Sequence, residues 1–246
     1  NFDYETLSKI NPKIVYASVS AYGPDAPDGN LPGTDAVGQA LSGIAEAYSI
    51  PGINLRTGVA SVADESCAIL TFGGILAAYI NAQKTGKGQK LETSLVGSAF
   101  RLLGWTMTTA MWSNKPPITG ARINGTREKP GIAACFNDID DKPFALQLSP
   151  ENWSVAMKAL NFYDVLEKEG LIDLGLAFES EQKKIDILNK LAELFSKQKR
   201  DHWISILRNA DMISTHVNTM LEASNDPNIK ENNYVTEVWY PELNKN

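Results

Sequence analysis

One acidic residue stands at the start of an apolar stretch. Asp64 lies three residues after Ser61, and an apolar run from Cys67 to Ile80 follows. Serine with an acid three residues later is typical of a capping box, and this spacing by itself favours a structural role. A carboxylate there is also kept ionised by the helix dipole, and the first-turn amides can stabilise a nearby oxyanion. The residue types therefore also allow Asp64 to act as a nucleophile toward an activated acyl group.

Other residues with chemical potential lack a supporting pattern. His202 and His216 lie in no motif, so structural roles are favoured, although residue order alone does not exclude a Ser-His-Asp triad. Asn137–Asp141 is similar to a calcium loop but lacks the glycine and the glutamate that such a loop needs, which favours a hairpin turn. Cys67 and Cys135 show no metal-ligand spacing. We therefore predict no metal site.

Composition limits the partners. At one domain per ~150 residues, 246 residues predict one or two domains. The net charge of −6 gives no basic field for nucleic acid or anionic lipid. The apolar run 67–80 has fourteen residues, fewer than the ~18 of a membrane span, and we interpret it as a buried helix. Residues 1–5 do not resemble a signal peptide, so we expect a cytoplasmic protein.

The first part of the chain alternates strands and helices. Apolar spacing predicts a buried strand over 14–20 and a helix over 35–48 that Asp35 is placed to cap. A helix over 62–83 ends at a glycine pair, and a long apolar helix over 91–112 follows a brief extended start. This pattern is typical of an α/β unit.

The composition of the sequence changes at residues 114–117, a segment that we interpret as a hinge. Beyond it, 132–136 and 143–148 flank a turn and predict a β-hairpin. Charged amphipathic helices are expected near 150–160, 181–197 and 200–209, and a strand over 234–240. The second part is thus predicted to be a smaller α+β unit.

Several ordered motifs carry a family resemblance that runs nearly end to end. They are Asn11–Gly23, Pro32–Asp35 with Gln39–Gly43, Gly74–Ala78 with Thr85–Gln89, and Val217–Thr219 with Asn225–Pro227. The sequence resembles the class III CoA-transferases (CaiB/BaiF type), the group that contains formyl-CoA transferase and carnitine CoA-transferase.

The resemblance implies a covalent mechanism. The family nucleophile is an Asp ten residues before the first glycine of Gly74–Ala78, which here is Asp64. Asp64 would attack a donor acyl-CoA to give an aspartyl mixed anhydride, and the CoA thiolate would then form an aspartyl-CoA thioester. Coenzyme A is a substrate, no metal or redox cofactor is implied, and the partners are an acyl-CoA and a small carboxylic acid. Family members form interlocked homodimers.

The resemblance also implies roles near the site. Asp35 falls where the family has an acid. Thr34 stands where related acyl-CoA racemases have a histidine, and threonine cannot move an α-proton at neutral pH. Leu95 matches a position that lines the acyl end of CoA, although a core role fits equally well. Gly125 lies in the loop 124–129, which replaces a glycine-rich loop of formyl-CoA transferase, and Pro32 replaces a family lysine.

The implied fold is a Rossmann-like large domain, partial in this chain, with a smaller α+β domain. Residues 1–113 would belong to the large domain, 114–123 to a linker and 124–212 to the small domain. Residues 213–246 would return toward the large domain. The family has further segments upstream and downstream, so the chain resembles the middle of such a protein. The alternatives are an acyl-CoA racemase or epimerase, disfavoured by Thr34, and a catalytically silent CoA-binding scaffold paralogue.

Overall fold

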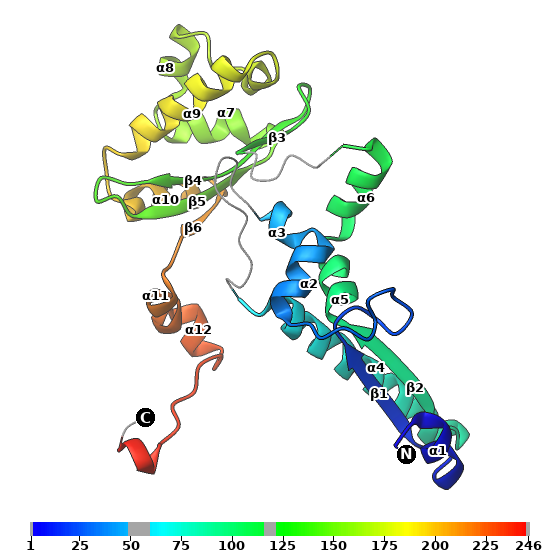
Figure 1. Cartoon of the computed structure of the whole chain (residues 1–246). Coiled ribbons are helices and arrows are strands. Elements are labelled where there is room, and N and C mark those ends of the chain that lie inside the picture. The colour runs from blue at the N-terminus through cyan, green and yellow to red at the C-terminus, as the bar shows by residue number, and fades with distance from the viewer. Residues whose placement is uncertain (1, 49–59, 116–121, 245–246) are drawn as a thin grey trace. The chain divides into compact units, whose positions relative to one another are not determined.

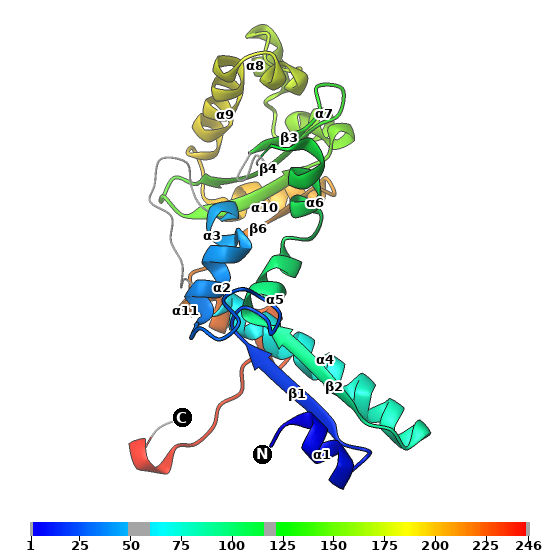
Figure 2. The same cartoon turned by 45° about the vertical axis from the view of Figure 1, so that its right-hand side comes forward.

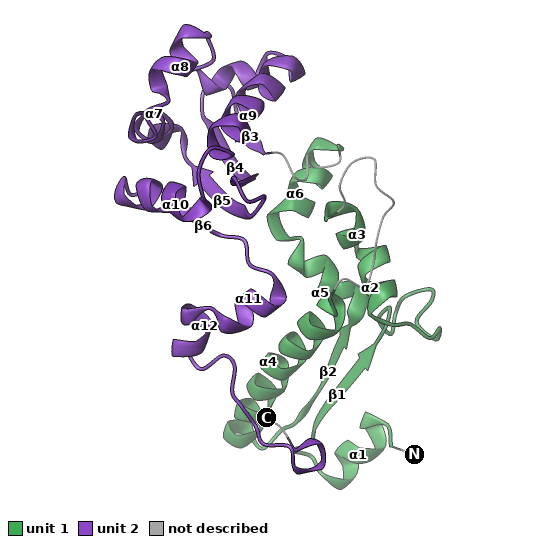
Figure 3. Ribbon diagram, turned by 90° about the vertical axis from the view of Figure 1, so that its left-hand side faces the viewer, with its two compact units in different colours: residues 1–120 green, residues 121–246 purple. Residues whose placement is uncertain are grey.

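The computed structural model describes residues 2–48, 60–115 and 122–244. The chain divides into two compact units, 1–120 and 121–246 (Figure 3), and each is described by itself. The predicted finer division, with 213–246 returning toward the large domain, stays a prediction.

A two-stranded parallel sheet organises the first unit. Strand β1 (Val15–Ser20) pairs with β2 (Gln89–Ser94), in register from Val15 opposite Gln89 to Ser20 opposite Ser94. Helix α4 (Val62–Thr85) lies along both strands (Figures 1 and 2) and ends at Gly86, whose φ is 72°. Because α4 ends just before β2 begins, its first turn lies at the opposite end, where both strands finish.

Shorter helices complete the first unit: α1 (Tyr4–Ile10), α2 (Asp35–Ser42), α3 (Ile44–Ala47), α5 (Leu95–Leu102) and α6 (Gly104–Ser113). The predicted helix 35–48 is therefore two helices, because Gly43 adopts a φ of 89° between them. For 91–112 the predicted brief extended start is confirmed, because β2 runs to Ser94, but the single long helix after it is wrong. That stretch forms the separate helices α5 and α6, with Gly104 at a φ of 47° where α6 begins.

Among the described residues, helix α4 is covered on one face. Its inner face is buried: Ala63, Ser66, Cys67, Thr71, Ala78 and Ala82. Ile69, Phe72 and Leu76 on the other face are exposed, so the expectation of a buried helix holds for one face only. The described residues contain one helix, α4, that is long enough and apolar enough to cross a membrane, judged by length and composition alone.

An antiparallel sheet organises the second unit. Its order is β3 (Ile123–Gly125), β4 (Pro130–Asn137), β5 (Pro143–Leu148) and β6 (Ile213–His216). The predicted hairpin is confirmed as β4 and β5, joined by a turn at 138–142. Alternate side chains of these strands are buried, as the period of a half-buried strand requires.

Helices α7 (Pro150–Ala159), α9 (Glu181–Phe195) and α10 (Arg200–Asn209) pack on the sheet, and α8 (Tyr163–Lys168) packs against α7. Helices α11 (Met220–Asn225) and α12 (Pro227–Glu231) follow β6 in the chain (Figure 1), and 3-10 turns are found at Leu174–Phe178 and Pro241–Leu243. The core joins Phe136 and Phe144 of the sheet to Phe195 and Trp203 of α9 and α10. The predicted strand 234–240 is wrong. Apart from a single bridge residue at Tyr240, these described residues are irregular. The fold is mixed α/β, as predicted.

Candidate active site

The first turn of α4 is capped by a side chain from another helix. Asp35, the first residue of α2, accepts the backbone N–H of Ala63 at 2.8 Å and that of Asp64 at 3.2 Å, both on Oδ1. A carboxylate at a helix N-terminus satisfies free amides and complements the helix dipole. Asp35 therefore caps α4, and the expectation that it caps its own helix is wrong.

This arrangement corrects the capping-box prediction. Ser61 is the N-cap residue of α4, but among the described residues its hydroxyl accepts none of the first-turn amides. Its ψ of 57° departs from the extended conformation usual at an N-cap. The Asp35 carboxylate instead occupies the position that the serine hydroxyl would take.

The amides of this turn are already bonded. Val62 N donates to Ala60 O at 2.7 Å, Glu65 N donates to Ser61 O at 2.8 Å, and the two amides between them donate to Asp35. The prediction that these amides also stabilise an oxyanion is therefore wrong for this arrangement. The side chain of Asp64 itself is exposed, as a nucleophile must be.

Close packing brings α2 onto this turn. A Cβ on Gly38 would lie 2.7 Å from Ala63 Cβ and 3.2 Å from Leu95 Cβ. Gly38 is therefore the contact point of α2 with the start of α4 and the start of α5. The lack of a side chain there lets Asp35, one turn earlier, reach the α4 amides.

A second glycine seats the segment that carries Thr34. A Cβ on Gly33 would lie 2.4 Å from Ala21 Cβ, just after β1. The motif 32–35 therefore packs against the end of the motif 11–23. Thr34 is the N-cap residue of α2, and its side chain is exposed.

Leu95 follows β2 directly and is half-buried. It packs against the small cluster of Ile44, Ala63, Ala99 and Leu103. The structure thus gives Leu95 a core role, and its predicted proximity to CoA stays a prediction. Asp64, Asp35, Thr34 and Leu95 all lie at or just beyond the carboxyl ends of the parallel strands, where ligands of open α/β sheets bind.

An open cavity of about 420 Å³ lies beside the same turn. Val62, Ile69, Leu70 and Leu102 give it an apolar lining, and Arg101 also contributes. Asp64 is not among its lining residues, although its neighbour Glu65 is. The cavity is a space for an apolar group beside the first turn of α4.

Gly125 belongs to the second unit. It ends β3 with a φ of 91°, and a Cβ there would lie 2.3 Å from Lys129 O, so the tight turn 126–129 requires glycine. Arg127 in this turn forms an ion pair with Glu179 at 2.5 Å, which engages its guanidinium. The predicted proximity of Gly125 to the substrate stays a prediction.

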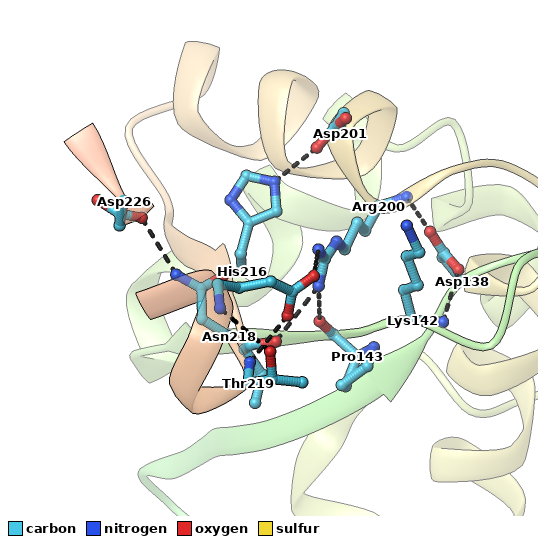
Figure 4. A network of polar contacts seen from close by, with 11 residues as sticks. Asp138, Lys142, Pro143, Arg200, Asp201, His216, Asn218, Thr219 and Asp226 are labelled. Atoms are coloured by element: carbon cyan, nitrogen blue, oxygen red, sulfur yellow. Dashed lines mark hydrogen bonds and ion pairs between the residues drawn. The ribbon is translucent and has the colours of Figure 1, made fainter. Parts of the chain in front are cut away.

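The histidines have structural partners. His216 Nε2 lies 2.5 Å from Asp201 Oδ1 (Figure 4), and His202 packs edge-on against Trp203. The hydrogen bond from His216 lowers the pKa of the Asp201 carboxyl below its ordinary value. Both histidines therefore act in folding contacts, as the lack of a motif predicts.

Figure 4 also shows how the motifs 217–219 and 225–227 meet. Asn218 donates to Asp226 Oδ2 at 3.1 Å, and Thr219 caps α11. Arg200 Nη1 donates to the carbonyls of Pro143 and Val217 at 3.0 and 3.3 Å. These contacts join the segment after β6 to α10 and to the start of β5 within the second unit. Within the described ranges no three His, Cys, Asp or Glu side chains gather as a metal site would require.

Sequence reasoning missed Gln39 and Gly38 as parts of this site. Gln39 is buried, and its Nε2 donates to Asp35 Oδ2 and, at 2.9 Å, to Ala60 O. The spacing of Asp35 and Gln39 by four residues was the available signal, because such pairs meet on one helix face.

An exposed acid at the carboxyl end of parallel strands, capped from a neighbouring helix, defines an α/β protein with a candidate acyl-transfer site. The chain belongs to CoA-transferase family III, whose family model matches residues 1–245. It is 29% identical over 230 residues to the acetyl-CoA:oxalate CoA-transferase of Acetobacter aceti, covering 92% of this chain and 57% of the relative. It is 26% identical to the alpha-methylacyl-CoA racemase of Mus musculus, covering 89% of this chain and 55% of the racemase.

The fold has solved counterparts. The crystal structure of a CaiB/BaiF family protein from Brucella suis matches with a TM-score of 0.71 and 22% identity, covering 94% of this chain and 60% of that one. The chain thus spans 55% to 60% of the lengths of these three proteins. At this identity the structural match shows the fold alone.

Proposed function

We propose that the protein carrying this chain transfers coenzyme A from an acyl-CoA to a carboxylic acid, with Asp64 as the nucleophile. The observation that carries the proposal is the position of Asp64 in this chain. Asp64 has an exposed carboxylate in the first turn of α4, at the carboxyl ends of β1 and β2. Three features support it: the family, the motif spacing and the apolar cavity beside this turn.

The proposed chemistry balances without a redox partner. An Asp64 oxygen attacks the thioester carbonyl, the C–S bond breaks, and CoA leaves as a thiolate from an aspartyl mixed anhydride. The thiolate attacks the Asp64 carbonyl carbon, which releases the donor carboxylate and leaves an aspartyl-CoA thioester. The acceptor carboxylate displaces CoA from this thioester, and the thiolate then attacks the acceptor carbonyl. Asp64 is regenerated as a carboxylate.

Trapping tests this proposal. The full-length protein is incubated with acetyl-CoA or succinyl-CoA and hydroxylamine, and the peptide containing Asp64 is analysed by mass spectrometry. We expect a hydroxamate on Asp64 that Asp64→Asn cannot form. Glu65→Gln is the matched control, because Glu65 is the adjacent exposed carboxylate. CoA transfer without modification of Asp64 would contradict the mechanism.

The racemase resemblance gives a second candidate function. A racemase relative matches the chain, but Thr34 supplies no group that exchanges a proton near neutral pH. Exchange of the α-proton without CoA transfer would favour that alternative, and binding of CoA with neither reaction would favour a scaffold.

The expected assembly and location belong to the same proposal. We expect a homodimer in the cytoplasm that uses acyl-CoA and a small acid and engages neither nucleic acid nor membrane. Coenzyme A is then the substrate, without a metal or redox cofactor. Light scattering of the full-length protein and cell fractionation test these expectations.

A further inference from the structure

Gln39 links α2 to the start of α4 directly through one hydrogen bond and supports Asp35 through a second. It is 4% exposed, so its amide has been removed from water and must be hydrogen-bonded to avoid a large cost. One bond from Nε2 goes to Asp35 Oδ2, one helical turn earlier, and the other goes to Ala60 O at 2.9 Å. Ala60 directly precedes the N-cap residue of α4.

The two oxygens of Asp35 therefore have separate partners. Oδ1 accepts the amides of Ala63 and Asp64, and Oδ2 accepts the Gln39 amide. The bond to Gln39 fixes the rotation of the Asp35 carboxylate, so that Oδ1 points at the first turn.

We propose that Gln39 is a positioning residue for Asp64, acting through Asp35 and Ala60. The proposal rests on the function proposed above, because it assigns Gln39 to the nucleophile of that reaction. Gln39 holds the start of α4 directly at Ala60 O, the residue before the N-cap, and acts on the Asp64 amide through Asp35, whose Oδ1 accepts that amide. A small displacement of a nucleophile can reduce its rate about 100-fold.

Two substitutions separate this role from simple packing. Gln39→Met keeps the length and removes both donors. We expect kcat/KM and the rate of hydroxamate formation on Asp64 to fall by about 100-fold at every pH, mainly through kcat. Ser42→Ala is the matched control. Ser42 is buried on the same helix. Among the described residues its hydroxyl donates to the backbone carbonyl of Gln39 and accepts the Ile44 amide, and neither bond is to Asp35 or Ala60, so rates should be unchanged.

Gln39→Glu supplies a readout that packing alone does not produce. When the two carboxyls at positions 39 and 35 share a proton, the protonated group donates and restores the bond; when both are ionised, they repel. The other titratable groups of the turn are Asp64 and Glu65, which are unchanged. Relative to wild type at the same pH, we expect Gln39→Glu to be impaired at about pH 8 and to recover at about pH 5.

Hydrogen exchange separates the two proposals. In Gln39→Met the amides of Ala63 and Asp64 should exchange faster than in wild type, and in Ser42→Ala they should not.

Two results would overturn the positioning role. One is a reaction rate in Gln39→Met equal to that of wild type, and the other is a Gln39→Glu pH profile parallel to that of Gln39→Met. If wild type forms no hydroxamate on Asp64, the proposed function fails, and unchanged amide exchange in Gln39→Met would then overturn the positioning role separately. If Gln39→Met does not fold, Gln39→Glu provides the test, because its two pH conditions are compared within one protein.

Discussion

The carboxylate oxygen Oδ1 of Asp35 lies 3.2 Å from the backbone nitrogen of Asp64 and accepts its hydrogen bond. Asp35 therefore caps the helix turn that contains Asp64. The backbone of the proposed nucleophile is fixed from a different helix, while its own side chain stays exposed for reaction.

Removal of this cap should destabilise the first unit. We expect Asp35→Ala to lower the free energy of unfolding by about 1–2 kcal/mol, the usual value of an N-cap, because two amides lose their acceptor. Ser61→Ala is the matched control and should change it by less than about 0.5 kcal/mol, because its hydroxyl accepts no first-turn amide in the described structure. Urea denaturation of both variants measures the difference, and equal losses would show that Ser61 is the real cap.

A side chain at position 38 should separate α2 from the α4 turn. We expect Gly38→Val to cost about 1–3 kcal/mol through overpacking against Ala63 and Leu95, and to slow modification of Asp64. Gly73→Ala is the control, because no described atom lies within 4 Å of the added Cβ and alanine favours a helix. Thermal melts and trapping rates compare the two. An active, stable Gly38→Val would contradict the close contact.

The buried Asp138 should make the second unit sensitive to acid. Burial opposes its ionisation, but the amides of Arg200, Lys142 and Asp140 outweigh this effect and hold the pKa of the carboxyl below its ordinary value. Figure 4 shows the bonds from Arg200 and Lys142. A lowered pKa stabilises the fold above the unfolded value of about 3.9, and this contribution is lost as pH falls through the lower folded value.

Asp138→Asn should therefore cost about 1–3 kcal/mol at neutral pH, because its NH₂ group would face an amide that needs an acceptor. The difference from wild type should narrow as pH falls below about 4. Asp140→Asn is the control, since that exposed side chain forms only a surface ion pair with Lys199 among the described contacts. A difference that stays constant down to low pH would show that the charge of Asp138 contributes nothing.

Transfer without α-proton exchange should distinguish this protein from a racemase. In D₂O, we expect the product acyl-CoA to carry no deuterium at the α-carbon, because the Thr34 hydroxyl is not a base near neutral pH. Mass spectrometry of the product after many turnovers measures this. Deuterium incorporation that persists in Asp64→Asn would point to proton chemistry elsewhere in the site.

The sequence correctly predicted those helices and strands whose sequence signals, such as an alternation of apolar residues or a terminal glycine, lie within a few residues of one another. The hairpin of β4 and β5 follows from alternating apolar residues around a polar turn, and α4 ends at the predicted glycine. Breaks were missed at Gly43 and Gly104, because a glycine within an apolar helical pattern looks the same whether or not it adopts a positive φ. The segment 234–240 has strand-like residues, but strands also need a paired neighbour, which a local pattern does not supply.

The sequence by itself determined the family and the identity of the candidate nucleophile, because ordered motifs and a fixed spacing to Asp64 are properties of the linear chain. Only the tertiary structure decided what surrounds that carboxylate. Ser61 was the obvious cap from its spacing, yet Asp35 takes that role from α2, and Gln39 supports it by donating to Asp35 and to Ala60 O. The physical reason is that a helix end offers free amides to whichever acceptor packing brings nearest. The missing side chain of Gly38 is what lets a distant acid come closer than a neighbouring serine.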